Sequence, residues 1–116
     1  GAHNPLAALE MKKYLNHKYY KKKIIMLLGM MANKEHSKFI KILKNNVHSI
    51  VALDIPNQIN FMPKEKLAEH ARSHNIISKT EMSIKSAFKN ISKQHKDAVI
   101  FCTGSLYFAG EILNLN

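Results

Sequence analysis

The stretch Ile24-Ile25-Met26-Leu27-Leu28-Gly29 decides the fold. Its five consecutive apolar side chains do not alternate with polar ones. Such a run is typical of a strand that is covered on both faces of a parallel sheet. The glycine ends the run, and a helical pattern of apolar residues follows it. The sequence therefore predicts a buried strand of an α/β fold at this position.

Helical and strand-like patterns alternate on both sides of this strand. Asn4 and Pro5 suit the N-cap and the first position of a helix that reaches about His17. The complete order, α-β-α-β-α-β-α-β-α, indicates a mostly parallel sheet with helices on both faces. The other helices are predicted over residues 34–44, 64–74, 81–94 and 105–113, the other strands over residues 49–53, 76–77 and 98–101, and a loop over residues 54–62.

Two expectations concern the ends of these elements. Thr80 is predicted to cap the helix at 81–94, with Met82 and Ile91 among the residues on its inner face. The segment Gly1-Ala2-His3-Asn4 has the character of a strand-to-helix turn, and the strand that would lead into it is missing from the N-terminus. We therefore expect this chain to be a piece of a longer protein, or a remnant of one.

Composition bounds the class of protein. The 116 residues include 46% hydrophobic residues, which supports one domain with its own core. No apolar run approaches the roughly 20 residues of a membrane-spanning helix, so no membrane association is expected. The single cysteine, Cys102, excludes a disulfide scaffold and a cysteine-based zinc site. It suits a reducing compartment, and we expect the cytoplasm.

The formal net charge of +10 needs dissection before it is taken to indicate a nucleic-acid partner. Arg72 is the only arginine beside 17 lysines, whereas recognition of base edges and bidentate contacts to phosphate favour arginine. The lysines are scattered, with one cluster at residues 21–23, and Asn and Ile are also abundant. We favour a composition bias over a nucleic-acid partner. The alternative is a non-catalytic Rossmann-like binding module with a basic surface for an anionic partner such as nucleic acid.

Three predicted turns should meet at the carboxyl ends of the strands. This edge is where open parallel sheets bind ligands. They are residues 1–4, 29–34 and 103–105, and each leads into a helix N-terminus, which favours anions. A carboxylate or phosphate is therefore the expected ligand. His3 and Ser105 are candidate ligands of this anion, although both positions also suit a capping side chain. Lys34 at the second turn is better explained as a solvated lysine.

The other candidate functional residues are better explained by structural roles. His70 and His74 have the i, i+4 spacing of a two-histidine metal site, but no third ligand is evident, and no metal site is expected. Cys102 at a strand end suits a small buried residue better than a nucleophile. Asp54 also ends a strand, like a ribose-binding acid, but no G-x-G-x-x-G turn precedes it. No catalytic residue is assigned to this chain.

Three motifs together resemble a known family. They are Gly1-Ala2-His3-Asn4-Pro5, Gly29-Met30-Met31-Ala32-Asn33-Lys34-Glu35 and Gly104-Ser105-Leu106-Tyr107-Phe108-Ala109-Gly110-Glu111. In order and spacing they are similar to the C-terminal domain of folylpolyglutamate synthase/dihydrofolate synthase, a branch of the Mur ligase superfamily. The resemblance covers residues 1 to about 113 and implies a Rossmann-like three-layer domain. Another Mur-type ligase acting on peptidoglycan precursors is the weaker alternative, because the third motif favours the folate branch.

The resemblance implies a function and a division of labour. Enzymes of the family use ATP and magnesium to phosphorylate a folate or dihydropteroate carboxylate, and the amine of L-glutamate then attacks the acyl phosphate. His3 and Ser105 match positions associated with the glutamate carboxylate, and Asn4 and Gly104 match positions that shape the turns. The ATP-binding P-loop belongs to the family's N-terminal domain, which is absent from this chain. The chain alone is therefore expected to hold no cofactor and to be inactive without that partner domain.

The motifs also depart from the family pattern. The family has an Asp directly before the position of Gly1, and its middle motif usually has Asp-Lys-Asp where this chain has Asn33-Lys34-Glu35. An arginine that is common in the loop before the third helix is replaced here by Asn60.

Overall fold

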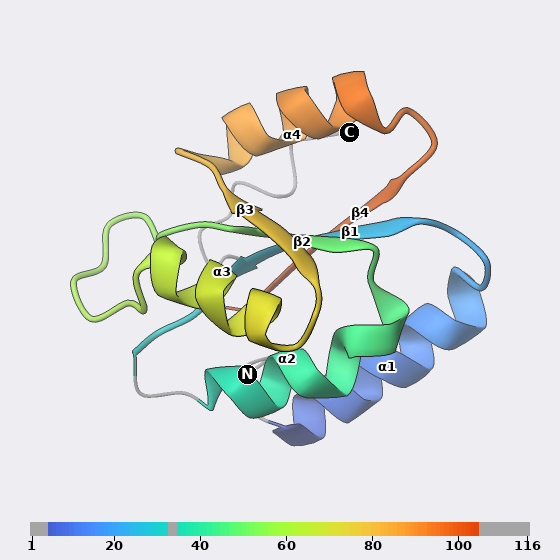
Figure 1. Cartoon of the computed structure of the whole chain (residues 1–116), viewed down its shortest axis with the longest axis horizontal. Helices are drawn as coiled ribbons and strands as arrows, with labels where there is room; N and C mark the ends of the chain where they lie inside the picture. Colours follow the sequence, from blue (N-terminus) through green and yellow to red (C-terminus); the bar gives the residue numbers. More distant parts are fainter. Residues whose placement is uncertain (1–4, 33–34, 105–116) are drawn as a thin grey trace.

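The predicted buried strand forms the centre of the sheet in the computed structural model, which describes residues 5–32 and 35–104. All six of its residues are buried, as the continuous apolar run requires. Helices and strands alternate along the whole described chain (Figure 1). The elements are α1 (Pro5–Lys18), β1 (Ile24–Gly29), α2 (His36–Leu43), a 3-10 turn η1 (Lys44–Asn46), β2 (Ser49–Ala52), α3 (Lys64–Ser73), β3 (Ile77–Thr80), α4 (Ile84–Gln94) and β4 (Val99–Gly104).

The described residues form one four-stranded sheet in the order β3-β2-β1-β4, and every pair of neighbours is parallel. The chain moves outward from β1 to β2 and β3 and then returns to the other side of β1 for β4. The strand order therefore reverses between β1 and β4. This topological switch point is where open α/β sheets bind ligands, just beyond the carboxyl ends of the strands.

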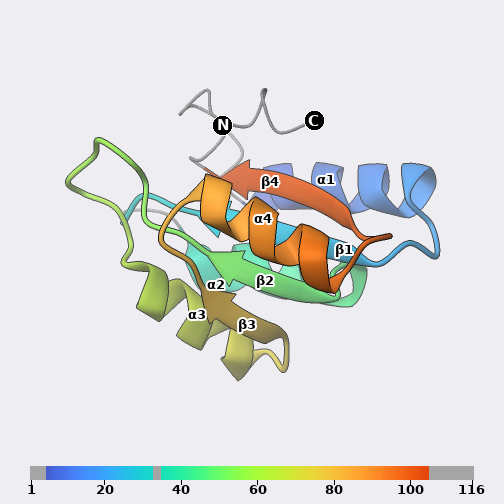
Figure 2. The same ribbon diagram turned by 90° about the horizontal axis from the view of Figure 1, so that it is seen from above.

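Helices cover both faces of the sheet, as predicted, and give it three layers. Helices α1, α2 and α3 pack on one face and α4 on the other (Figures 1 and 2). The alternation of side chains along β1 supplies both cores: Met26 and Leu28 face the three helices, whereas Ile25 and Leu27 face α4. The predicted α/β fold with a mostly parallel sheet is confirmed, and its described strands are all parallel.

The third strand and fourth helix do not begin where the sequence predicted. The strand runs over Ile77–Thr80 rather than residues 76–77, so Thr80 ends a strand and does not cap a helix. Helix α4 begins three residues late, because Ser83 and Ser86 form a reciprocal capping box there. Met82 therefore precedes the helix and is 85% exposed, which corrects its predicted place on the inner face.

Two other boundaries shift by two or three residues. Helix α2 begins at His36 rather than at residue 34, and β4 extends to Gly104 rather than ending at residue 101. The helix predicted over residues 105–113 lies outside the described residues. Among the described residues, no helix is both long and apolar enough to cross a membrane.

Candidate functional site

The carboxyl ends of β1 and β4 lie side by side at the switch point. Gly29 and Gly104, the last residues of the two strands, are register partners in the parallel ladder. The turns that follow β1 and β4 therefore start from adjacent points on the same edge. Gly104 itself belongs to β4, and its predicted role in shaping a turn at the site stays a prediction. His3, Asn4 and Ser105 lie outside the described residues.

Helix α1 runs antiparallel to β4 and brings its N-terminus to the same edge. The hydroxyl of Thr103 donates to the sulfur of Met11 at 3.1 Å, and the rings of Tyr14 and Phe101 lie 6.4 Å apart. Later residues of the helix thus contact earlier residues of the strand. Pro5 is therefore at the end of α1 that points toward the carboxyl edge (Figure 2).

The loop between β2 and α3 holds the segment that follows β1. The backbone N–H of Met62 donates to Met30 O at 2.8 Å, and the N–H of Ala32 donates to Asn60 O at 2.8 Å. Met31 and Phe61 form an antiparallel bridge between these two bonds. The sequence predicted this loop but not the pairing. The only signal for it was the pair of apolar side chains, Phe61 and Met62, at the end of a polar loop.

The two carboxylates near the carboxyl ends of β2 and β3 already have protein donors. Asp54 accepts a hydrogen bond at 2.8 Å from the backbone N–H of Lys64, the first residue of α3. Glu81 accepts from the hydroxyl of Ser86 at 3.1 Å and from the side-chain amide of Asn90 at 2.8 Å. Asp54 therefore stabilises a helix start, in agreement with the preference against a ribose-binding role. Sequence reasoning missed Glu81, which ties the α4 helix to the end of β3.

Cys102 is not poised to act as a nucleophile. Its side chain is half-buried and packs against the core between the sheet and α4. Burial raises the pKa of the Cys102 thiol to about 11, so the reactive thiolate is scarce near neutral pH. The structural role expected for this residue agrees with its environment.

The two histidines with metal-site spacing make separate contacts with α2. The ring of His70 stacks on His36 with centroids 5.8 Å apart, and His74 Nε2 is 2.9 Å from the hydroxyl of Ser37. Within the described ranges, no group of three or more potential metal ligands occurs. Both histidines therefore help to join α2 and α3.

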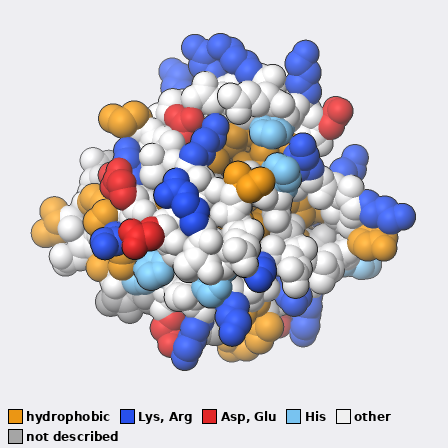
Figure 3. All heavy atoms as spheres, in the orientation of Figure 1, with side chains coloured by type: hydrophobic (Ala, Val, Ile, Leu, Met, Phe, Trp, Pro, Cys, Tyr) orange, Lys and Arg blue, Asp and Glu red, His pale blue; other side chains and the backbone are white. Residues whose placement is uncertain are grey.

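On the face seen in Figure 3, the basic side chains are spread out rather than gathered in one stripe. Figure 3 shows Lys and Arg side chains over the whole visible face, with Asp and Glu among them. Arg72 is engaged in the fold, since it donates to Ser78 O at 3.0 Å. The preference for a composition bias over a nucleic-acid partner stays a prediction.

Comparison with protein families identifies one match, which covers nearly the whole chain. The family described as dihydrofolate synthetase, C-terminal domain, matches residues 1–115. A comparison with curated protein sequences finds no match.

Solved structures of related fold cover almost all of this chain. A Mycobacterium tuberculosis folylpolyglutamate synthase complexed with ADP and AMPPCP has a TM-score of 0.85 at 21% identity, over 99% of this chain and 28% of its own. The bifunctional folylpolyglutamate synthase/dihydrofolate synthase of Yersinia pestis complexed with AMPPNP and Mn has a TM-score of 0.77 at 21% identity, over 98% of this chain and 27% of its own. The E. coli protein FolC in complex with DHPP and ADP has a TM-score of 0.75 at 20% identity, over 97% of this chain and 27% of its own. The chain thus spans little more than a quarter of these proteins, and the likeness establishes the fold.

Proposed function

Because the chain belongs to the family of dihydrofolate synthetase C-terminal domains, we propose that it is the glutamate-binding domain of an ATP-dependent ligase. The ligase adds L-glutamate to folate or dihydropteroate. ATP phosphorylates a carboxylate of folate or dihydropteroate, which gives an acyl phosphate and ADP. The glutamate amine then displaces phosphate to form the amide. The reaction takes place in the cytoplasm.

One observation carries this proposal: Gly29 and Gly104 adjoin at the switch point of the sheet, where α1 also points its N-terminus. A helix N-terminus presents free backbone N–H groups and a partial positive charge, and both favour a carboxylate. Ser105 directly follows Gly104 in the sequence, and His3 is two positions before Pro5. We assign them as ligands of the glutamate carboxylate, with Asn4 and Gly104 shaping the two turns.

The nucleotide and magnesium belong to a partner, the N-terminal ATPase domain of the same ligase. Asp54 and Glu81, the carboxylates next to the ends of β2 and β3, already accept hydrogen bonds within the fold, which supports this assignment. This chain therefore contributes glutamate binding and closure of the site, and the partner domain contributes the phosphoryl transfer. L-Glutamate and folate are the substrates, and neither a membrane nor a nucleic acid takes part.

The test is reconstitution with a separately expressed N-terminal ATPase domain of a folylpolyglutamate synthase. We expect glutamate-dependent release of ADP and phosphate when the two parts are combined, and none from this chain alone. A partner domain whose P-loop lysine is replaced by alanine is the matched control. If the partner domain is well folded and binds ATP, but the combined parts produce no ligation, the proposal is contradicted.

A further inference from the structure

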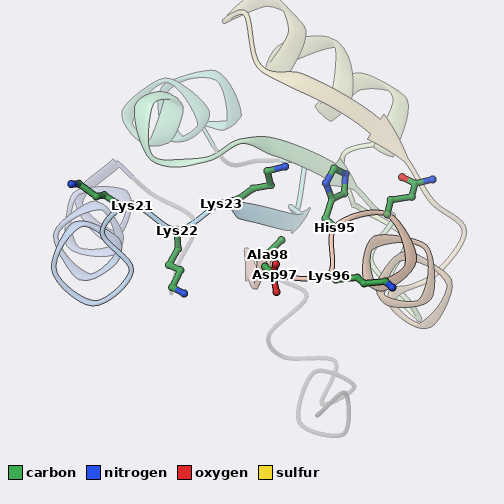
Figure 4. Close-up of a pocket in the computed structure, with 8 residues that line it drawn as sticks. Lys21, Lys22, Lys23, His95, Lys96, Asp97 and Ala98 are labelled. Atoms are coloured by element: carbon green, nitrogen blue, oxygen red, sulfur yellow. The ribbon is translucent and has the colours of Figure 1, made fainter.

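A hollow of about 450 Å³ lies at the amino ends of β1 and β4, the edge opposite to the candidate site (Figure 4). Two connectors form it: residues 21–23 between α1 and β1, and residues 94–98 between α4 and β4. The sheet fixes their spacing, since the N–H of Val99 donates to Lys23 O at 2.8 Å. A six-residue strand is roughly 16–20 Å long. The hollow is therefore well separated from the carboxyl edge.

The hollow is strongly basic, because its lining has few acidic side chains to balance its lysines. Lys21, Lys22, Lys23 and Lys96 line it, and Asp97 is the one acidic residue among the lining residues. The two ion pairs found in the described parts of the chain, Glu10–Lys13 and Glu35–Lys38, lie elsewhere. Figure 4 shows Lys23 extending from its connector toward His95 on the other one. Lys21 and Lys22 extend away from His95, so the lysines surround the hollow without meeting in it. Their summed positive charge favours an anion there.

A neighbouring histidine is affected by the same charges. The backbone N–H of His48 donates to Ile24 O at 2.7 Å, at the start of β1. The His48 and His95 ring centroids lie 5.7 Å apart. Burial lowers the pKa of His48, and the nearby Lys23 and His95 lower it further. The positive potential thus extends along the amino edge. A second hollow of about 250 Å³ continues there, sharing Gln94 and His95 with the first and adding Lys79 without any acidic group.

Lys21 has a backbone conformation that lysine does not favour. Its φ is 66°, and the other non-glycine residues with positive φ in the described ranges are Asn57 and Asn75. The N–H of Lys22 donates to Tyr19 O and closes a turn in which Lys21 takes the third position, where glycine or asparagine is preferred. The Lys21 ammonium lies 5.6 Å from the centroid of the Tyr20 ring, which holds this side chain at the rim of the hollow.

We propose that this hollow binds a compact oligophosphate anion. Lysine serves as a point charge for phosphate, and its flexible stem allows lysines from both connectors to turn toward one small anion. A nucleic acid would require a longer basic track and would favour arginine, but Arg72 is engaged with Ser78 O. The volume is within the range of small-molecule sites.

The test is titration of the complete chain with sodium tripolyphosphate, followed by calorimetry and by amide chemical shifts. We expect saturable binding, with shift changes at residues 21–23, 48 and 94–98. Lys23→Gln and Lys96→Gln should each weaken binding about threefold to fivefold, as for an exposed charge pair. Lys41→Gln, which removes an exposed lysine on α2, is the matched control and should leave binding unchanged.

A second variant separates binding from folding. Lys21→Gly suits the positive φ, so it should preserve or raise the Tm while it weakens tripolyphosphate binding. If Lys41→Gln weakens tripolyphosphate binding equally, or if chemical-shift changes spread over the lysines of α2 and α3, the binding is general charge attraction. Either result would overturn the proposal. Citrate binding as tightly as tripolyphosphate, or an RNA oligonucleotide that tripolyphosphate cannot displace, would also overturn it.

Discussion

Asp54 shows how a single exposed residue can stabilise a helix to which it does not belong. Pro63 precedes α3 and supplies no side-chain cap, and Asp54 provides the acceptor for the N–H of Lys64 instead. We predict that Asp54→Ala lowers the free energy of unfolding by about 1 kcal/mol, as loss of an N-cap does. Asp54→Asn keeps an acceptor oxygen and should lose less. Urea denaturation measures both, and equal losses from the two variants would argue against the hydrogen bond.

His3 and Ser105 are the residues on which the glutamate proposal depends. In a reconstituted ligase, we predict that His3→Ala and Ser105→Ala each raise the glutamate KM about tenfold or more. The physical reason is that a hydrogen bond to a charged group contributes about 1.5–3 kcal/mol. The KM for ATP should stay unchanged.

Ser92→Ala is the matched control, because Ser92 is an exposed serine on α4. If Ser105 only caps a helix, Ser105→Ala would lower the Tm without changing the glutamate KM. That outcome would remove Ser105 from the site and leave the domain assignment intact.

At the scale of elements, the contact between α2 and α3 depends on neutral histidine. His36 Nε2 lies 3.2 Å from Met31 O, and its ring stacks on His70. Burial, and then the charge of His70, lower the pKa of His36 below its usual 6.5. The unfolded chain therefore binds a proton more readily than the folded one. Stability from this residue is present above about pH 6.5 and is lost as the pH falls through the lowered pKa.

We predict that the urea midpoint falls as the pH is lowered from 7 to 5, and that His36→Gln makes this dependence shallower. His48 contributes in the same direction, since its pKa is also lowered. His17→Gln is the control, because His17 is exposed on α1. An unchanged slope in His36→Gln would show that His36 does not control the pH dependence.

The elements also show what sequence patterns can and cannot establish. The apolar run from Ile24 to Leu28 had one good interpretation, and the alternation around it fixed the parallel sheet. The start of α4 was predicted wrongly because Thr80 and Ser83 are both acceptable caps. Only Ser83 has its reciprocal partner, Ser86, three residues later. The choice between two local caps thus depended on how far β3 extends beside β2.

For the candidate site, the sequence predicted that the carboxyl ends of the strands meet at one edge, and the ends of β1 and β4 do so. Gly29 and Gly104 meet because parallel strands end together, and the order of elements already indicated this. The basic hollow at the opposite edge was not foreseen. Its lysines at residues 21–23 were recognised as a cluster, but Lys96 and His95 come from a connector more than 70 residues later. Only the register of β1 with β4 places these groups together.

At the scale of the whole molecule, a net charge of +10 acts on stability as well as on binding. The two ion pairs in the described ranges are exposed pairs, each between residues three apart on the chain, and such pairs stabilise a fold weakly. Repulsion among the lysines should therefore dominate the long-range electrostatics, and salt should screen it.

We predict that the Tm rises by about 2–5 °C between 10 and 200 mM NaCl. A thermal scan at each salt concentration measures this change. Sodium fluoride should act like NaCl if screening is the cause, whereas tripolyphosphate should stabilise the chain at much lower concentration through the basic hollow. The Lys23→Gln variant separates the two effects, because it should keep the NaCl response and lose part of the tripolyphosphate response. A Tm that falls with NaCl would mean that attraction between opposite charges outweighs lysine repulsion in the folded chain.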